Sequence, residues 1–178
     1  MTSSWLKNEK MTLRAPEPED LELMYAMETD TTLWCAGNAT LPYSRYTLRA
    51  YLEQSKQDLL SERQARFVIE LSDGNCAGMI DLADYSPLDA RAEVCIGLLS
   101  EHRGTGTAIE ALTLLCEYAF GFLGVNQLYA YIPENHEKSK KLFQKAKFSE
   151  TATLKKWKRE GEKFIDISLF QLFKNNYS

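Results

Sequence analysis

Two glycines, Gly104 and Gly106, lie between an apolar run at residues 94–99 and a longer apolar-rich stretch at residues 109–122. This order predicts a strand that turns through a glycine loop into a helix. Glycine lets the main chain come close to a ligand because no Cβ intervenes. The first N–H groups of a helix lack intrahelical acceptors and lie at the positive end of its dipole. The loop therefore predicts a binding site for a phosphate group.

The loop does not fit two familiar phosphate motifs. It is not a Walker A sequence, because no Gly-Lys-Ser/Thr ends it. The dinucleotide-binding fingerprint needs a third glycine or an alanine where this chain has Ile109, and no acidic residue ends the next predicted strand. A nucleotide-binding fold of either kind is therefore not predicted.

The loop matches a different pattern. Arg103, Gly106 and Ala108 stand at the defining positions of a stretch that resembles the R/Q-x-x-G-x-G/A motif of the GCN5-related N-acetyltransferases, the GNAT family. Residues 134–148 resemble the second signature of that family. The two signatures occur in the expected order, and the resemblance covers nearly the whole chain.

Two shorter matches point to one branch of the family. Residues 12–21, with Thr-Leu-Arg followed by Glu-Asp-Leu, resemble its N-terminal pattern, and so does Arg91-Ala92-Glu93, ten residues before the loop arginine. That branch contains spermidine N-acetyltransferase and the ribosomal-protein N-terminal acetyltransferases.

The resemblance implies an N-acetyltransferase with acetyl-CoA as its co-substrate. The loop amides would hold the pyrophosphate, the preceding strand would pair with the pantetheine arm, and an amide near Leu98 would polarise the thioester carbonyl. For Lys138 a solvated helix face is the alternative role. The residues expected to contact acetyl-CoA are Ile96, Gly97, Leu98, Arg103, Gly104, Thr105, Gly106, Thr107, Ala108, Asn135, His136, Lys138 and Phe143.

Three positions depart from the second signature. The usual asparagine position falls on His136, with Asn135 one residue earlier, and the usual glycine before the final phenylalanine is Lys147. The position that often carries a tyrosine general acid is Phe143, which has no hydroxyl. The branch often lacks this tyrosine, so activity is not excluded, but the usual proton donor is.

Acetyl transfer to an amine also requires a group that removes a proton from the ammonium. Glu93 is the candidate general base, since burial beside the cleft would raise its pKa. The alternatives are a structural ion pair with Arg91 or a substrate-binding carboxylate. Asp81 and Asp84 are the other acidic candidates, and Asp81 is also a candidate for binding the acceptor.

Aromatic residues supply the other candidate acceptor contacts. Trp34 and Tyr43 lie in a segment that often borders the acceptor pocket in this family, where aromatic walls would suit an aliphatic amine; simple packing is the alternative. Tyr129 and Tyr131 alternate with apolar residues, so both are expected on one face of the sheet, as packing residues or, alternatively, as proton donors.

The apolar patterns predict a single α+β domain over residues 1–178, a GNAT-like fold by resemblance. It has a mixed, mostly antiparallel sheet of about seven strands flanked by about four helices. Residues 29–42 are expected to be irregular. Strands are expected at residues 11–15, 67–71, 76–83, 92–99, 127–132, 148–158 and 163–173, and helices at 16–28, 44–61, 106–122 and 135–147.

Composition narrows the functional classes. No apolar run reaches the roughly 20 residues that span a bilayer, and no signal core is present, so a cytoplasmic protein without membrane contact is expected. The four cysteines form no metal-binding pattern, so we expect no metal and buried, reduced thiols. The net charge of −4 argues against a nucleic-acid partner.

The charge is uneven along the chain. Residues 1–90 carry 8 Lys and Arg against 15 Asp and Glu, a net charge of −7, and residues 91–178 carry 13 against 10, a net charge of +3. The acidic half could attract a cationic acceptor, although an unevenly charged solvated surface is the alternative.

The leading interpretation is acetylation of a polyamine or another small cationic primary amine. A protein N-terminal amine, a non-catalytic acyl-CoA-binding module and a purely structural domain are the alternatives, and a homo-oligomer is compatible with each.

Overall fold

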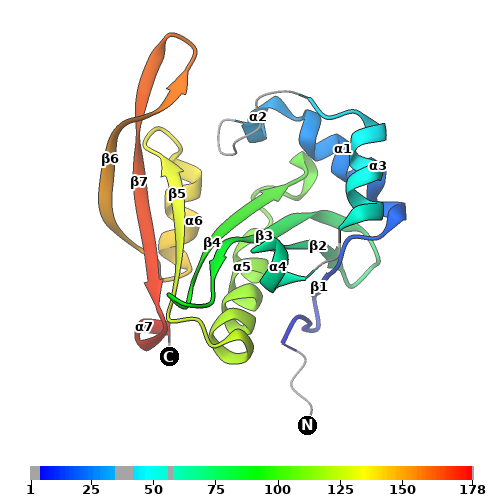
Figure 1. The fold of residues 1–178 in the computed structure, drawn as a ribbon, viewed down its shortest axis with the longest axis horizontal. Helices are drawn as coiled ribbons and strands as arrows, with labels where there is room; N and C mark the ends of the chain where they lie inside the picture. Colours follow the sequence, from blue (N-terminus) through cyan, green and yellow to red (C-terminus); the bar gives the residue numbers. More distant parts are fainter. Residues whose placement is uncertain (1–4, 35–41, 56–57, 178) are drawn as a thin grey trace.

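The computed structural model describes residues 5–34, 42–55 and 58–177. Within them, seven strands form one mixed sheet in the order β1-β2-β3-β4-β5-β7-β6, in which β4 and β5 run parallel and the other neighbours antiparallel (Figure 1). The predicted α+β fold, with about seven strands and four longer helices, is confirmed. The elements are β1 (Met11–Arg14), η1 (Pro18–Asp20), α1 (Leu21–Thr29), α2 (Thr31–Trp34), α3 (Arg45–Gln54), α4 (Leu59–Glu62), β2 (Ala65–Leu71), β3 (Cys76–Ser86), β4 (Arg91–Leu98), η2 (Ser100–His102), α5 (Thr107–Glu117), the π-helical η3 (Tyr118–Leu123), β5 (Gln127–Pro133), α6 (Glu137–Lys145), β6 (Ser149–Glu160), β7 (Lys163–Phe173) and α7 (Lys174–Tyr177).

The single helix predicted over residues 44–61 is wrong, because α3 and α4 are separate. Ser55 follows α3 in an extended conformation (φ −62°, ψ 122°). Asp58 is the N-cap of α4, and its side chain accepts a hydrogen bond of 3.1 Å from the N–H of Leu60 in the first turn of that helix. Serine and aspartate side chains compete for main-chain hydrogen bonds and so favour helix ends over helix interiors.

The segment predicted to be irregular contains the short helix α2. The Asp30 carboxylate accepts hydrogen bonds from the main-chain N–H (2.9 Å) and the hydroxyl (2.6 Å) of Thr32 and so caps the start of α2. Residues 35–41 of this segment lie outside the described residues.

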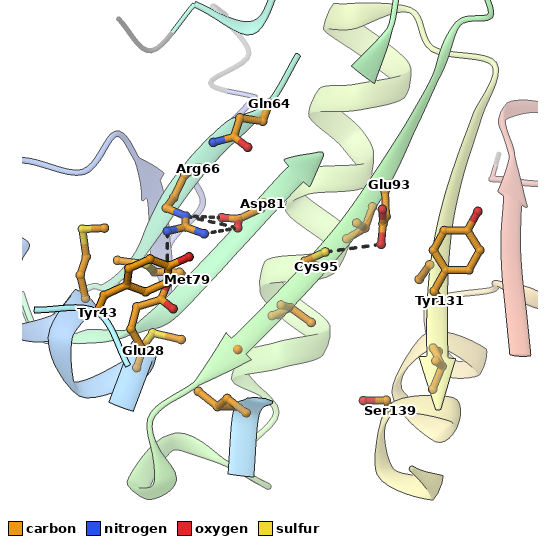
Figure 2. A pocket seen from close by; sticks show the side chains of 18 of the residues that line it. Glu28, Tyr43, Gln64, Arg66, Met79, Asp81, Glu93, Cys95, Tyr131 and Ser139 are labelled. Atoms are coloured by element: carbon orange, nitrogen blue, oxygen red, sulfur yellow. Dashed lines mark hydrogen bonds and ion pairs between the residues drawn. The ribbon is translucent and has the colours of Figure 1, made fainter. Parts of the chain in front are cut away.

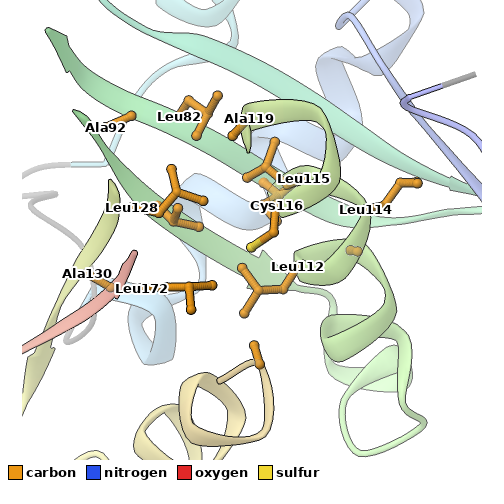
Figure 3. Close-up of a cluster of buried hydrophobic side chains, with 14 of the residues drawn as sticks. Leu82, Ala92, Leu112, Leu114, Leu115, Cys116, Ala119, Leu128, Ala130 and Leu172 are labelled. Atoms are coloured by element: carbon orange, nitrogen blue, oxygen red, sulfur yellow. The ribbon is translucent and has the colours of Figure 1, made fainter. Parts of the chain in front are cut away.

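Helices cover both faces of the sheet. On one face α5 packs Leu112, Leu115 and Cys116 against buried strand residues such as Leu82 and Leu128 (Figure 3). On the other face Met24 of α1 and Leu48 of α3 pack against Val68 and Met79. Each of these side chains is almost completely buried, so hydrophobic burial anchors helices to the two sides of the central strands.

The parallel strands β4 and β5 separate soon after they meet. They pair only at Arg91–Glu93 with Gln127–Tyr129, although both strands continue beyond these residues. The far edge of β4 stays paired with β3, and the far edge of β5 with β7. The ribbons of β4 and β5 diverge in Figure 1, and the pairing ends at Glu93 and Tyr129. Beyond these residues the facing edges have no strand partner among the described residues.

The end of α6 explains how the chain accommodates the lysine where the family signature has glycine. Lys147 adopts a left-handed conformation (φ +69°), its N–H bonds to Gln144 O (3.0 Å), and the N–H of Phe148 bonds to Phe143 O (2.9 Å). This pattern is a Schellman cap, in which the left-handed residue is usually glycine because a Cβ is disfavoured there. Lys147 therefore ends the helix in a strained conformation.

Lys147→Gly is expected to stabilise the protein by about 1 kcal/mol, because glycine removes the Cβ penalty of the left-handed residue. The free energy of unfolding from urea denaturation measures this effect. Lys147→Ala is the control, since it keeps the strain and, like the glycine variant, loses the 3.4 Å hydrogen bond from Lys147 Nζ to Tyr177 O. Equal stability of the two variants would contradict the assignment of strain.

Candidate active site

The opening between β4 and β5 continues into a cleft of about 540 Å³. Main-chain and apolar groups of β4, β5 and α6 line one part, including Ile96, Ile132 and Phe143. The other part lies between the sheet and α1 and α3, where Arg66 and Asp81 point toward one another (Figure 2). We call the part lined by β4, β5 and α6 the slot, and the part between the sheet and helices α1 and α3 the chamber.

The free edge of β4 presents main-chain groups to the slot. The N–H of Leu99 donates to Ala77 O (2.9 Å), and Met79 lies opposite Gly97, so by antiparallel alternation the main-chain groups of Gly97 face β3. Those of Ile96 and Leu98 face the opening. The carbonyl of Leu98 accepts a hydrogen bond from Arg103 Nε (2.9 Å). The groups left for an extended ligand are those of Ile96 and the N–H of Leu98.

The glycine loop adopts the geometry that the sequence predicts. Gly104 and Gly106 have φ angles of +79° and +91°, and no heavy atom lies within 4 Å of where a Cβ would stand on either. Gly106 is the N-cap of α5. The Thr105 hydroxyl donates to His102 O (2.7 Å) and lies 2.8 Å from the Thr107 hydroxyl, so the described hydrogen bonds tie the loop together locally. Thr107 and Ala108 form the first turn of α5, where main-chain N–H groups have no intrahelical acceptor.

The Arg103 side chain reaches away from the loop. Its guanidinium binds Asp30 Oδ2 (2.6 Å), the Thr32 hydroxyl (3.1 Å) and Leu98 O (2.9 Å). Asp30 and Thr32 lie at the junction of α1 and α2. The structure therefore places the guanidinium between helices and strand, and only the main chain of Arg103 remains with the loop.

Glu93 lies at the centre of the cleft. The Cys95 thiol donates a hydrogen bond to Glu93 Oε1 at an Sγ–O distance of 3.8 Å (Figure 2). Burial raises the pKa of Glu93 above its ordinary value of 4.5, the Cys95 hydrogen bond lowers it, and the Asp84 charge raises it. A carboxyl group with a raised pKa and access to a cleft is suited to accept a proton.

Cys95 itself corrects the expectation that the cysteines are buried. Its thiol is exposed to the open cleft, although surrounding protein atoms and the Glu93 carboxylate raise its pKa to about 12. It is therefore a protonated hydrogen-bond donor at neutral pH. Cys76 is partly buried and Cys116 is buried, whereas Cys35 lies outside the described residues.

Asp81 belongs to an ion-pair cluster at the chamber end. Arg66 contacts both of its carboxylate oxygens, with Nη2–Oδ2 at 3.0 Å, and also pairs with Glu28 Oε1 at 3.5 Å. Burial raises the pKa of Asp81, and its ion pair with Arg66 opposes that shift. Three carboxylates, those of Glu28, Asp81 and Glu93, thus share the cleft with one guanidinium.

Arg91, the residue that could have paired with Glu93, has other described partners. Its Nη1 donates to Asp84 Oδ2 (2.7 Å) and to the Tyr129 hydroxyl (2.9 Å), and the hydroxyl donates to the same Asp84 oxygen (2.6 Å). Burial and this acceptor raise the pKa of Tyr129 above its ordinary value. Tyr131 lies on the same face as Tyr129, 42% exposed, and lines the cleft (Figure 2).

The residues predicted near α6 fall in different places. Phe143 lines the cleft and is buried, with Phe148 packed edge-on against it at 5.0 Å between ring centroids. His136 caps α6, with Nδ1 2.6 Å from the Ser139 hydroxyl, and burial lowers its pKa. Asn135 donates to Glu160 Oε2 (3.2 Å) in the β6–β7 hairpin, and Lys138 is exposed.

Of the two aromatic residues predicted as acceptor contacts, the structure describes the side chain of Tyr43 alone. Tyr43 lines the cleft and is 45% exposed. Trp34 is the last residue of α2, and its side chain lies outside the described part of the chain.

Sequence reasoning missed several residues that line the cleft. Arg66 shares the alternation of Val68, and so its sheet face could have been predicted, but Glu28 of α1 approaches it only through tertiary packing. Ser139 precedes Phe143 by four residues in α6 and lines the cleft with it, but it was not among the predicted site residues. No group of three or more His, Cys, Asp or Glu side chains in the described residues is arranged to hold a metal ion. No helix in the described part of the chain is long and apolar enough to cross a membrane.

Comparison with known proteins agrees with this architecture. The chain is 29% identical over 180 residues to the uncharacterized N-acetyltransferase p20 of Bacillus licheniformis (97% of this chain, 98% of that protein). It is 30% identical over 140 residues to spermidine N(1)-acetyltransferase of Escherichia coli strain K12 (77% of this chain, 72% of that protein).

Among solved structures, the fold resembles spermidine N-acetyltransferase from Vibrio cholerae in complex with CoA and spermine, with a TM-score of 0.85 and 23% identity over 96% of this chain and 99% of that one. A dodecameric structure of the Vibrio cholerae enzyme in an intermediate state matches with a TM-score of 0.80 at 23% identity, over 96% of this chain and 97% of that chain.

Residues 10–149 match the acetyltransferase (GNAT) domain family. The match covers most of the chain, including the glycine loop and the whole second signature at residues 134–148. The diverging parallel strands, the glycine loop that caps α5 and the residues that line the cleft all lie within the matched residues. The chain therefore belongs to the GNAT family of acetyltransferases and is an acetyl-CoA-dependent N-acetyltransferase.

Proposed function

We propose that the enzyme acetylates a small cationic primary amine, of the polyamine class, by direct attack on acetyl-CoA. The observation that carries this proposal is the charge of the cleft. Glu28, Asp81 and Glu93 outnumber Arg66, the one basic side chain that lines it in the described residues, which leaves a net negative chamber at the end of the slot. Such a chamber attracts ammonium groups. The likeness to spermidine acetyltransferases supports the same class of acceptor.

Two features support acetyl-CoA in the slot. An extended arm with amide groups can pair with the free main-chain groups of Ile96, which leaves the N–H of Leu98 for the thioester carbonyl. A pyrophosphate can approach the amides of residues 104–108, because both glycines leave open space and α5 contributes its N-terminal dipole. Phe143 would pack beside the pantetheine arm. Asn135, His136 and Lys138, at the start of α6, are the other residues proposed to contact acetyl-CoA.

The proposed chemistry needs one base and one oxyanion contact. Acetyl-CoA supplies the acetyl group as a thioester. The Glu93 carboxylate takes a proton from the ammonium, directly or through water, which frees the nitrogen lone pair. As the new nitrogen–carbon bond forms and the carbon–sulfur bond breaks, the N–H of Leu98 stabilises the charge on the carbonyl oxygen. The sulfur leaves as a thiolate, and the nitrogen, now bound to the acetyl group, loses its second proton, which passes through water to the thiolate.

Phe143 cannot protonate that thiolate. A thiol has a pKa near 8.5, so the thiolate is a stable leaving group near neutral pH and needs little assistance. Two hydroxyls on the β5 and α6 sides of the cleft, those of Tyr131 and Ser139, are the protein groups to which we assign the final proton transfer, together with water.

An acceptor panel tests the proposal. With acetyl-CoA in excess, thiol release is expected with spermidine, spermine and short diamines. For a primary amine of equal length with a neutral tail, kcat/KM is expected to be at least about tenfold lower, because only a second ammonium group is attracted by Glu28 and Asp81. Peptides with free N-termini form the third arm. Release above hydrolysis with peptides alone would replace the polyamine by a protein N-terminus.

A second candidate acceptor is the N-terminal amine of a protein, since such an amine is also a primary ammonium group that an acidic cleft attracts. We further propose that the enzyme is a homo-oligomer, since the Vibrio cholerae relative has a dodecameric structure. Its mass by light scattering tests the oligomeric state.

A further inference from the structure

Arg103, the first residue of the glycine motif, bridges three elements. Its Nε donates to Leu98 O at the end of β4 (2.9 Å), its Nη1 to the Thr32 hydroxyl in α2 (3.1 Å), and its Nη2 to Asp30 Oδ2 (2.6 Å). These contacts span more than 70 residues of sequence. They use three of the five N–H donors of the guanidinium, one on each nitrogen, so every nitrogen of the side chain is already bound to a protein acceptor.

Asp30 joins this contact to the helices. Its other carboxylate oxygen, Oδ1, accepts from the N–H (2.9 Å) and the hydroxyl (2.6 Å) of Thr32, and its carbonyl accepts from the N–H of Leu33 (2.9 Å). The hydrogen bonds from Thr32, followed by those from Arg103, lower the pKa of Asp30 against the effect of burial. Asp30 is therefore ionised at neutral pH and binds α2 on one side and Arg103 on the other.

The elements held by this contact form one wall of the chamber. A Cβ on Gly97 would stand 2.8 Å from Met27 Cε and 3.6 Å from a Leu33 methyl carbon, so α1 and α2 press directly on β4. Met27, Glu28 and Leu33 all line the cleft. The position of these side chains depends on how the α1–α2 junction sits over the end of β4, where Arg103 binds it.

We propose that Arg103 is a positioning residue that fixes the α1–α2 wall of the acceptor chamber to the acetyl-CoA loop, and that its side chain is not a phosphate ligand. This inference rests on the proposed acceptor end of the cleft. The main-chain amides of residues 104–108 then account for phosphate binding without the guanidinium. Loss of the Arg103–Asp30 pair loosens the wall and weakens acceptor binding, while acetyl-CoA affinity stays.

The test compares Arg103→Gln, Asp30→Asn and the double variant. Each single variant is expected to raise KM for the best amine about fivefold and to leave the Kd of acetyl-CoA within about twofold. Because both residues act through one contact, the KM of the double variant is expected to be no higher than the higher KM of the two single variants. Glu22→Gln is the matched control. It removes the exposed 2.8 Å pair between Glu22 of α1 and Arg45 of α3, and its KM is expected to be unchanged.

Two results would overturn the inference. If Arg103→Gln weakens acetyl-CoA binding tenfold or more and Asp30→Asn does not, the guanidinium is a phosphate ligand. Unchanged KM in both single variants removes the positioning role. If the wild-type enzyme turns over no amine, the proposed function fails, and hydrogen exchange of residues 27–33 then decides the inference alone: faster exchange in both variants supports it, and unchanged exchange contradicts it.

Discussion

Gly106→Glu is expected to weaken acetyl-CoA binding about 100-fold or more. Gly106 caps α5 in a left-handed conformation, and the space where its Cβ would stand is open. A glutamate carboxylate there would occupy the positive end of the helix, the place proposed for the pyrophosphate, and repel it. Two like charges 4 Å apart interact by roughly 4 kcal/mol near a protein surface, and screening by salt reduces that figure at an exposed loop.

Calorimetric titration of acetyl-CoA measures the effect, and two variants separate charge from strain. Gly106→Ala introduces the left-handed strain without the carboxylate and is expected to lose much less affinity. Gly124→Glu introduces both at another open left-handed glycine (φ +70°), at the far end of the same helical segment, and is expected to bind normally. If Gly106→Glu binds like Gly106→Ala, the phosphate site is elsewhere.

The local features of this fold could be predicted from the sequence because short-range chemistry determines them. Glycines at positions 104 and 106, after one apolar run and before another, require a left-handed turn into a helix, and both do have positive φ angles. Strand alternation likewise placed Tyr129 and Tyr131 on one face of the sheet. These features need only a few neighbouring residues for their explanation.

The break between α3 and α4 could not be predicted from apolar spacing, since Leu59 and Leu60 continue the helical pattern. The interruption comes from Ser55 and Asp58, whose side chains make alternative hydrogen bonds, and these weak preferences were outweighed by the apolar pattern. Lys147 shows the reverse case, in which a departure from the signature leaves the local geometry unchanged at a cost in strain.

The shape of the site depends on contacts between distant segments. The divergence of β4 from β5 leaves no trace in the sequence, because each strand keeps its apolar alternation whether or not it has a partner. The pairing of Arg66 with Glu28 and of Arg103 with Asp30 joins residues that are far apart in the chain. The motif arginine was therefore assigned to the phosphate by resemblance, whereas its guanidinium binds the α1–α2 junction.

Glu93→Gln is expected to lower kcat by about 100-fold to 1000-fold and to leave the Kd of acetyl-CoA within about twofold. A positioned general base contributes on this scale, and an amide of the same shape cannot accept the proton. Burial raises the pKa of Glu93, so at a pH above that pKa the ionised carboxylate makes the folded protein less stable than a neutral side chain would. The neutral amide is therefore expected not to lower Tm. Stopped thiol release with intact binding and Tm identifies the base. Asp84→Asn is the control for charge, since Asp84 binds Arg91 and Tyr129 and its charge raises the pKa of Glu93. A similar loss of kcat in that variant would assign the effect to the loss of a negative charge near Glu93.

The pH profile tests the same role without removing the carboxylate. A base acts when ionised, so kcat/KM falls as the pH drops through the pKa of Glu93, and because that pKa is raised, the fall begins above the pH at which an ordinary glutamate with a pKa of 4.5 would titrate. The Cys95 thiol donates to Glu93 and lowers this pKa. Cys95→Ala removes the donor, so the acidic limb is expected to move to higher pH while kcat on the alkaline plateau stays nearly constant. A limb that does not move would mean that the titrating group is not Glu93, because no other change in the variant adds or removes charge at neutral pH.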